Sequence, residues 1–287
     1  MTATLYALGA IALWASLATL GVALSHIPPF LLTGIALLIG SCVALPVSGY
    51  NLRQWQVPVA TLGLGVAGLF GYHFLFFMAL RSAPAVEANL VNYLWPLLMV
   101  VLAPVVLVGV RLRASHIVAA ILGFVGAIIA MVGAQPDNST AGGMFTGWAW
   151  GYVPALGSAF VWASYSLLCR RVQPFPTAAI GLFGLVSGLL ALVCHWAMEA
   201  PVVLTGRDVW LLGVLGLGPL GAAFYLWDMA LKQGDVRQIG ILSYLTPLAS
   251  TVLLMLTGQR ALTWSVAVAA VLILGGAAIG SRIGRGS

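Results

Sequence analysis

Two pairs of polar or aromatic side chains stand in otherwise apolar stretches of this sequence. His73 and Phe77 are four residues apart, as are Phe224 and Asp228, so each pair would share one face of a helix. At bilayer depth a histidine or a carboxylate is unfavourable unless it faces the interior of the protein or a cavity. His73 could instead be a core histidine bonded to a backbone carbonyl, and Asp228 could pair with Lys232. We expect both to line a cavity.

Two further pairs of polar residues precede a proline by a few positions. A proline in a membrane helix frees a backbone carbonyl about one turn earlier, and a kink there would expose acceptors beside the polar side chains. The kinks could also serve packing alone, with the tyrosines as ordinary interhelical hydrogen bonders. Their occurrence at two places favours a hinge or a binding role. The residues are Asn92 and Tyr93 before Pro96, and Ser243 and Tyr244 before Pro247.

Two tryptophans lie in matched sequence surroundings. Trp14 and Trp162 each begin the tripeptide Trp-Ala-Ser, near the middle of an apolar stretch rather than at its ends. Tryptophan usually gathers at the membrane interface, so these indoles are either lipid-facing bulk or an inward aromatic wall for a flat ligand. Tyr165, three residues after Trp162, would join that wall.

The composition indicates the solvent around these residues. Hydrophobic residues make up 62% of the chain and charged residues 6%, with a mean hydropathy of +1.08, whereas soluble domains carry about 25% charged residues. The basic residues are scattered between apolar runs and form no stripe, so nucleic acid is not an expected partner. We expect the lipid bilayer to surround the chain. We expect no metal site and no cofactor.

The apolar stretches are each close to the roughly 20 residues that a helix needs to cross the hydrocarbon core. We therefore predict an all-α membrane protein with ten transmembrane helices. The predicted helices cover residues 3–24, 29–49, 57–80, 85–109, 115–134, 147–169, 176–198, 208–231, 237–258 and 262–282.

Part of the sequence occurs twice. Met78-Ala79-Leu80-Arg81 recurs as Met229-Ala230-Leu231-Lys232, and Tyr-Leu-x-Pro at 93–96 recurs at 244–247, both 151 residues on. Trp-Ala-Ser at 14–16 recurs at 162–164, 148 residues on. Such duplication is how many membrane carriers are built. The predicted units are a first five-helix repeat (1–135), a linker (136–146) and a second five-helix repeat (147–287).

An odd number of helices in each repeat means that the two copies enter the membrane in opposite orientations. With the N-terminus in the cytoplasm, nine basic residues fall in inner loops and three in outer loops, which agrees with the positive-inside rule. Both termini are therefore expected in the cytoplasm. Inverted repeats around a central cavity offer two near-equivalent ways of closing it, which is the basis of alternating access.

The Trp-Ala-Ser motifs and the repeated Ala-Leu-[basic]…Tyr-Leu-x-Pro resemble those of the EamA-type transporters in the drug/metabolite transporter superfamily, over essentially the whole chain. Tyr72-His73-Phe74 and Asn92-Tyr93-Leu94-Trp95-Pro96 look most like the bacterial aromatic amino acid exporters. The resemblance implies an inner-membrane carrier, with the fifth and tenth helices outside a basket of the others, that exports Phe, Tyr, Trp or related compounds.

A small-molecule substrate is thus the expected partner, and the bundle is large enough to work as a monomer. The aromatic part would meet Trp14, Phe77, Tyr93, Trp162, Tyr165 and Tyr244, and the zwitterionic end would meet His73, Asn92, Asp228 or Ser243, with Pro96 and Pro247 as gating kinks. Alternatives are a carrier of other amino acids, purines or drugs, or an intramembrane enzyme. An enzyme would need a convergent acid/base set, for which only His73 and Asp228 qualify, so we expect no catalytic residues.

Overall fold

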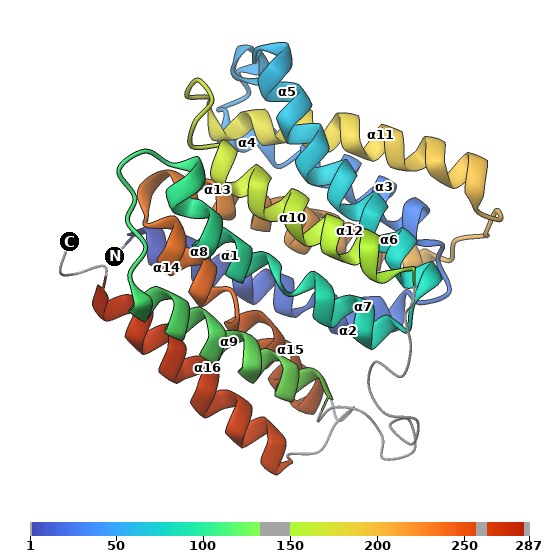
Figure 1. Ribbon diagram of the computed structural model, residues 1–287. Coiled ribbons are helices and arrows are strands. Elements are labelled where there is room, and N and C mark those ends of the chain that lie inside the picture. Colours follow the sequence, from blue (N-terminus) through green and yellow to red (C-terminus); the bar gives the residue numbers. More distant parts are fainter. Residues whose placement is uncertain (1, 133–149, 257–262, 284–287) are drawn as a thin grey trace.

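The structure is a computed structural model that describes residues 2–132, 150–256 and 263–283 (Figure 1). This described part of the chain forms helices and no strand. The predicted linker at 136–146 lies outside it. In chain order the first half contains α1 (Thr2–Ala15), α2 (Leu17–Ala23), α3 (Pro29–Ser41), α4 (Ala44–Val47), η1 (Leu52–Trp55), α5 (Val59–Val66), η2 (Ala67–Gly71), α6 (Tyr72–Ser82), α7 (Ala85–Asn92), α8 (Trp95–Val106) and α9 (Ala114–Val132). The second half contains α10 (Tyr152–Leu168), η3 (Thr177–Ala179), α11 (Ile180–Met198), α12 (Gly206–Leu217), η4 (Gly218–Ala222), α13 (Ala223–Gln233), α14 (Val236–Leu242), α15 (Leu245–Leu256) and α16 (Trp264–Ile283).

Eight helical stretches of the described chain are long and apolar enough to cross a membrane. Each coincides with one of the predicted segments, so the all-α membrane class is confirmed. The remaining two predicted segments, 147–169 and 262–282, are occupied by α10 and α16. The eight stretches are Thr2–Ala23, Pro29–Val47, Val59–Ser82, Ala85–Val106, Ala114–Val132, Thr177–Met198, Gly206–Gln233 and Val236–Leu256.

Several of these stretches are interrupted, and the interruptions match between the halves. The helix breaks between α7 and α8 at Tyr93-Leu94, and between α14 and α15 at Ser243-Tyr244, 150 residues further on. A proline cannot donate an intrahelical hydrogen bond, so it is tolerated best in the first turn of a helix. Pro96 lies in the first turn of α8 and Pro247 in the first turn of α15. The π-helical turns η2 and η4 are 151 residues apart. The prolines therefore begin second half-helices instead of kinking continuous ones.

The first helix of each half packs against helices of the other half. The first helix of one half lies against the third apolar stretch of the other, because α1 packs on α13 and α10 packs on α6. In the same way α1 packs on α15, and α10 packs on α8. The pair α9 and α16 lies side by side at one edge of the bundle (Figure 1). The six remaining long stretches, with α1 and α10, surround the middle.

The bundle has two distinguishable ends. At one of them α1 begins close to Gly234, and α16 ends beside α14. The loops and helix ends here hold Arg53, Arg111, Arg113, Arg170, Arg171, Lys232 and Arg237, and we call this the basic end. Arg81 and Arg207 lie at the other end, which we call the opposite end.

Hydrogen bonds at the basic end join segments within the second half and also join the two halves. Within the second half Arg170 donates to the carbonyl oxygens of Leu231 and Gly234, the latter at 2.8 Å. Between the halves Arg237 donates to the carbonyl oxygen of Arg111. At the opposite end the two carboxylate oxygens of Glu199 accept hydrogen bonds from the backbone of Phe30 and Leu31, at 3.0 and 3.2 Å. Glu199 thereby caps α3, because the first N–H groups of a helix lack intrahelical partners.

Candidate functional site

A cavity of about 470 Å³ occupies the middle of the bundle. This volume lies in the range of roughly 300–1,000 Å³ that is typical of small-molecule sites. Among its lining residues, Val86 lies near the start of α7, Met131 near the end of α9, and Leu254 near the end of α15. All three positions are toward the opposite end, so the cavity extends from the middle of the bundle in that direction. The remaining lining residues are Trp14, Leu17, Ala18, Tyr72, His73, Phe76, Asn89, Asn92, Tyr93, Trp95, Ala130, Trp162, Leu220, Phe224, Thr246, Pro247, Ser250 and Thr251.

Trp162 is the centre of an aromatic wall in this cavity. Its ring centroid lies 5.9 Å from that of Trp14, 5.5 Å from that of Tyr72 and 5.7 Å from that of Phe224. These separations are typical of edge-to-face and offset aromatic contacts. Because the four rings come from α10, α1, α6 and α13, the wall is assembled from both halves of the chain. A flat apolar ligand could stack on it.

Trp227 closes the wall on the side of the basic end. Its side chain is 1% exposed, and its ring lies 5.2 Å from Trp14 and 5.6 Å from Trp95. Its indole N–H donates to Ser166 Oγ at 3.1 Å. This satisfied hydrogen bond accounts for the presence of a fully buried indole, whose N–H needs a partner.

The polar groups beside the aromatic wall form a hydrogen-bonded set. Ser158 Oγ donates to Asn92 Oδ1 at 2.8 Å, and Asn92 Nδ2 donates to Tyr72 Oη at 3.2 Å. The amide of Asn92 is therefore held at both ends at the point where α7 stops. Trp14 Nε1 donates to the carbonyl oxygen of Pro219 at 3.1 Å. Pro219 belongs to the π-helical turn η4, and such turns leave carbonyl groups without their usual intrahelical partners.

His73 combines the two roles considered for it from sequence. It lines the cavity, and its Nδ1 lies 2.6 Å from the carbonyl oxygen of Leu69 in the π-helical turn η2. The ring centroid of His73 is 6.5 Å from that of Phe224, its counterpart in the duplicated sequence. The backbone bond thus orients the imidazole while one edge of the ring remains beside the cavity.

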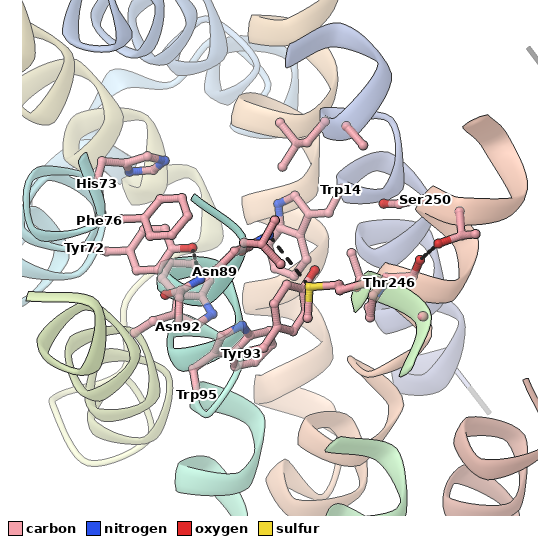
Figure 2. A pocket seen from close by; sticks show the side chains of 18 of the residues that line it. Trp14, Tyr72, His73, Phe76, Asn89, Asn92, Tyr93, Trp95, Thr246 and Ser250 are labelled. Carbon is pink, nitrogen blue, oxygen red and sulfur yellow. Dashed lines mark hydrogen bonds between the residues drawn. The ribbon is translucent and has the colours of Figure 1, made fainter. Parts of the chain in front are cut away.

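The wall across from these residues carries hydroxyl groups from α15. Figure 2 shows Tyr72, His73 and Phe76 on one side, and Thr246 and Ser250 on the other. Ser250 Oγ donates to the carbonyl oxygen of Ala15 at 3.0 Å. The cavity is therefore amphipathic, with aromatic rings on one side and small hydroxyl side chains on the other.

The structure brings half of the residues singled out from sequence to the cavity and places the others outside its lining. Those at the cavity are Trp14, His73, Asn92, Tyr93, Trp162 and Pro247, and those outside are Phe77, Tyr165, Asp228, Ser243, Tyr244 and Pro96.

Asp228 is engaged at the basic end. Its Oδ2 accepts hydrogen bonds from Lys232 Nζ and from Thr177 Oγ1, each at 2.6 Å. Lys232 Nζ also donates to the carbonyl oxygen of Phe175 at 2.8 Å. These contacts join α13 to the segment that precedes α11. The structure therefore corresponds to the alternative in which Asp228 is paired, because an unpaired carboxylate that is 4% exposed would be strongly unfavourable.

Tyr244 and Tyr165 pack against glycines instead of facing the cavity. A methyl group at Gly123 of α9 would overlap the ring of Tyr244, and one at Gly68 would overlap the ring of Tyr165. The absence of a side chain at each glycine leaves room into which the aromatic ring fits. Tyr244 is consequently 0% exposed and Tyr165 is 5% exposed.

Phe77 and Ser243 also have neighbours that keep them from the cavity. The ring of Phe77 lies 5.4 Å from that of Phe30 on α3, although it remains in contact with His73 at 6.0 Å. Ser243 Oγ donates to the carbonyl oxygen of Ile239 at 2.9 Å, one turn back in α14. Serine often makes this local bond, which satisfies its hydroxyl inside a helix.

Cavity residues that the sequence analysis had not singled out include Tyr72, Phe76, Asn89, Thr246 and Ser250. A signal for some of them was present in the helical spacing. Asn89 lies three residues before Asn92, and Ser250 lies four residues after Thr246, so each repeats a lining position one turn along its helix. Thr246 and Trp95 occupy the same position in the two Tyr-Leu-x-Pro motifs, and both line the cavity.

Comparison with known proteins identifies relatives along the whole chain. The model of the EamA-like transporter family matches residues 1–132 and 149–282. The chain is 40% identical, over 99% of its own length and 98% of the relative's, to a protein of Ancylobacter novellus named aromatic amino acid exporter YddG. It is 26% identical to the Escherichia coli K12 protein of the same name, over 96% of this chain and 94% of that one.

Two further comparisons concern location and fold. An uncharacterized inner membrane transporter of Escherichia coli K12, YhbE, is 27% identical over 76% of this chain and 67% of its own. A solved crystal structure superposes with a TM-score of 0.89 at 38% sequence identity, covering 99% of both chains. The relatives and the apolar helices together indicate a multi-pass membrane protein.

Proposed function

Because this chain belongs to the EamA-like transporter family, we propose that it is a secondary transporter that exports phenylalanine, tyrosine, tryptophan or similar amphipathic metabolites across the bacterial inner membrane. The observation that carries this proposal is the amphipathic cavity, in which rings from both halves of the chain face hydroxyl groups of α15. Two relatives named as aromatic amino acid exporters support the choice of substrate. The family and these relatives are transporters, so the chain is a carrier and not an intramembrane enzyme.

The aromatic side chain of the substrate would stack among Trp14, Trp162 and Phe224. Their separations of 5.7 to 6.1 Å describe one continuous aromatic surface. The polar end of the substrate would lie closer to the middle of the cavity, within reach of His73, Asn92 and the hydroxyl-bearing wall. Tyr93, which lines the cavity beside Asn92, would complete the contact with the ring.

The proposed architecture is ten transmembrane helices in two inverted five-helix repeats, with a joint between residues 136 and 146. Three features support it: the matched π-helical turns, the matched helix breaks, and the packing of α1 and α10 each against the other half. The concentration of basic residues at one end supports a cytoplasmic location for that end and for both termini. The cavity would then extend toward the outside. The proposed unit is a monomer without a cofactor.

Transport would require the basic end to open as the opposite end closes. In the described conformation Asp228, Lys232 and Thr177 tie the basic end together. Phe77 and Arg81 occupy the equivalent positions in the first half, and Arg81 makes a long contact of 3.4 Å with the carbonyl oxygen of Met198. The breaks before Pro96 and Pro247 would serve as the hinges, because each proline lacks the N–H that would bond across the break and the regular hydrogen-bond ladder is interrupted there.

Purified protein in liposomes provides the direct test. Liposomes loaded with unlabelled phenylalanine should accumulate radiolabelled phenylalanine by exchange, and protein-free liposomes should not. Tryptophan and tyrosine should compete, whereas threonine and adenine should not. Competition by adenine or threonine alone would reassign the carrier within its superfamily.

Variants connect this activity to the cavity. Trp14→Ala and His73→Ala should lose exchange by at least about tenfold, since each removes a ring that lines the site. Cells producing either variant should also lose resistance to a toxic phenylalanine analogue while still inserting the protein in the membrane. Normal exchange by both variants would remove this cavity from consideration as the binding site.

A further inference from the structure

The hydroxyl of Thr246 is a buried polar group without a partner. In the described part of the chain, five buried side-chain polar atoms lack a hydrogen bond, and they belong to Thr19, Trp55, Ser187, Tyr244 and Thr246. Of these five residues, Thr246 is the one that lines the cavity. Thr246 is 7% exposed, so its hydroxyl has little access to water as a hydrogen-bond partner. A buried hydroxyl left unpaired is unfavourable, and a ligand that pairs with it gains correspondingly.

The neighbouring hydroxyl groups on the same wall are already occupied. Ser250 Oγ donates to the carbonyl oxygen of Ala15 at 3.0 Å, and Thr251 Oγ1 donates to the carbonyl oxygen of Pro247 at 2.8 Å. Each hydroxyl has one hydrogen to donate, so neither is available to a ligand without breaking an internal bond. Thr246 therefore offers the free donor on this side of the cavity.

The backbone around Thr246 favours a negative charge. Thr246 is the second residue of α15, a helix of twelve residues that begins after the break at Ser243-Tyr244. The N-terminus of a helix carries about half a positive charge, and discontinuous membrane helices use such ends to bind anionic groups of a substrate. The described residues that line the cavity include no Asp, Glu, Lys or Arg, so no side-chain charge competes with this end.

The first half of the chain does not duplicate this arrangement. At the equivalent position α8 carries Trp95, whose indole packs 6.4 Å from Trp162 and 5.6 Å from Trp227. One half-helix thus begins with a ring of the aromatic wall and the other begins with a hydroxyl. A ligand bridging them has an aromatic end and an anionic end.

We propose that Thr246 Oγ1, at the N-terminus of α15, donates a hydrogen bond to the α-carboxylate of the substrate. The assignment rests on the proposed function and adds a specificity-determining residue to it. The carboxylate accepts the hydroxyl hydrogen, and the aromatic ring of the same molecule lies against Trp14 and Trp162. Compounds that lack the carboxylate therefore bind less well than the amino acid.

The test compares phenylalanine with phenethylamine, which has the same ring and amine but no carboxylate. Both are used as inhibitors of radiolabelled phenylalanine exchange in proteoliposomes. The measured quantity is the inhibition constant of phenethylamine divided by that of phenylalanine. In Thr246→Val, which keeps the shape and removes the hydroxyl, this ratio should fall roughly tenfold or more, as expected for a hydrogen bond to a charged group. Thr246→Ser restores the donor and should keep the wild-type ratio. Thr251→Val is the matched control on the same helix and should keep it too, because its hydroxyl is bonded to Pro247.

The outcomes separate this inference from the proposed function. A Thr246→Val protein that exchanges phenylalanine with the wild-type ratio would overturn the carboxylate assignment and leave the transport function standing. A weakening of both inhibitors by the same factor would overturn it as well, since that pattern indicates a structural role. Wild-type protein that exchanges no phenylalanine would refute the proposed function and this inference with it.

Discussion

The two copies of the duplicated passage share a backbone plan and differ in what their side chains do. In the first copy Tyr93 lines the cavity, and Phe77 packs against Phe30 on α3. In the second copy Asp228 is tied to Lys232 at the basic end, and Tyr244 is packed against α9 with no exposed surface.

This difference shows that the similarity in sequence between the two copies does not carry over to the roles of equivalent residues. The π-helical turns recur 151 residues apart and the breaks between half-helices 150 residues apart, so the two copies interrupt their helices at matching places. The surroundings of the equivalent side chains differ, because Gly123 makes room for Tyr244 and Lys232 provides a partner for Asp228. The second copy stabilises closure of the basic end, and the first copy contributes more of the aromatic cavity.

Replacing the two equivalent tyrosines should separate stability from transport. Tyr244→Ala removes a fully buried aromatic side chain and should lower the free energy of unfolding by about 4 kcal/mol. Tyr93→Ala should lower it much less and reduce phenylalanine exchange at least about tenfold. Thermal unfolding in detergent and exchange in liposomes measure the two effects. Equal losses of stability would contradict the contrast between the copies.

Replacing the two equivalent basic residues should separate the two ends. Lys232→Ala leaves the buried carboxylate of Asp228 without its cation and should destabilise the protein by about 3 kcal/mol. Arg81→Ala removes an exposed side chain with one long hydrogen bond, and we expect a change below about 0.5 kcal/mol. The measurement is the unfolding midpoint of each variant. A larger shift for Arg81→Ala than for Lys232→Ala would contradict the conclusion that the basic end is more strongly bonded than the opposite end.

Filling the space beside Tyr244 should also affect stability. Gly123→Ala places a methyl group where the Tyr244 ring lies and should cost about 2 kcal/mol, as overpacked cores do. Gly63→Ala is the control, because its added methyl group meets no atom within 4 Å. The control should unfold at the wild-type temperature or slightly above it. If Gly123→Ala also unfolds at the wild-type temperature, the Tyr244 ring is not held tightly against Gly123.

The smallest effect concerns the starts of α7 and α14. Pro84 precedes α7, whereas Asp235 caps α14 by accepting a hydrogen bond from Arg237 N at 2.9 Å. Burial raises the pKa of Asp235, but the hydrogen bonds from Arg237 outweigh burial and hold this pKa below its ordinary value. A lowered folded-state pKa means that the carboxylate stabilises the protein above its unfolded-state pKa, and that this stabilisation is lost as pH falls through the folded-state pKa.

Asp235→Ala should therefore lose about 1 kcal/mol at neutral pH. The difference from wild type should shrink as the pH is lowered below the ordinary range for aspartate. Unfolding midpoints measured at several pH values provide the check. A difference that is independent of pH would mean that the charge of Asp235 contributes nothing.

The helices and their interruptions could be predicted because they depend on local properties. The lengths of the apolar runs predicted the eight stretches that are long enough to cross a membrane. Trp14 and Trp162 were predicted to point inward, and the structure places their ring centroids 5.9 Å apart. The prolines at 96 and 247 indicated where the helices are interrupted. None of these features requires knowledge of distant contacts.

The surroundings of each side chain could not be predicted, since they depend on residues far away in the chain. Tyr93 and Tyr244 stand in the same motif, and only Gly123, from another helix, explains why Tyr244 is buried. Helical spacing placed Phe77 beside His73, which is correct, but Phe30 on α3 turns Phe77 away from the cavity. Thr246 gave no sign of its missing hydrogen bond, because an unsatisfied hydroxyl is visible only when its neighbours are known.

Accessibility of cysteines at the two ends tests alternating access most directly. Cys169 follows α10 at the basic end, close to Asp228, and Ala18→Cys places a thiol in the cavity. Cys42→Ser and Cys194→Ser remove the other free thiols. Labelling with an impermeant maleimide from each side of membrane vesicles should show that Asp228→Asn raises the reactivity of Cys169 and lowers that of Ala18→Cys. Reactivities that rise together, or that do not respond to Asp228→Asn, would contradict a carrier whose two ends open in turn.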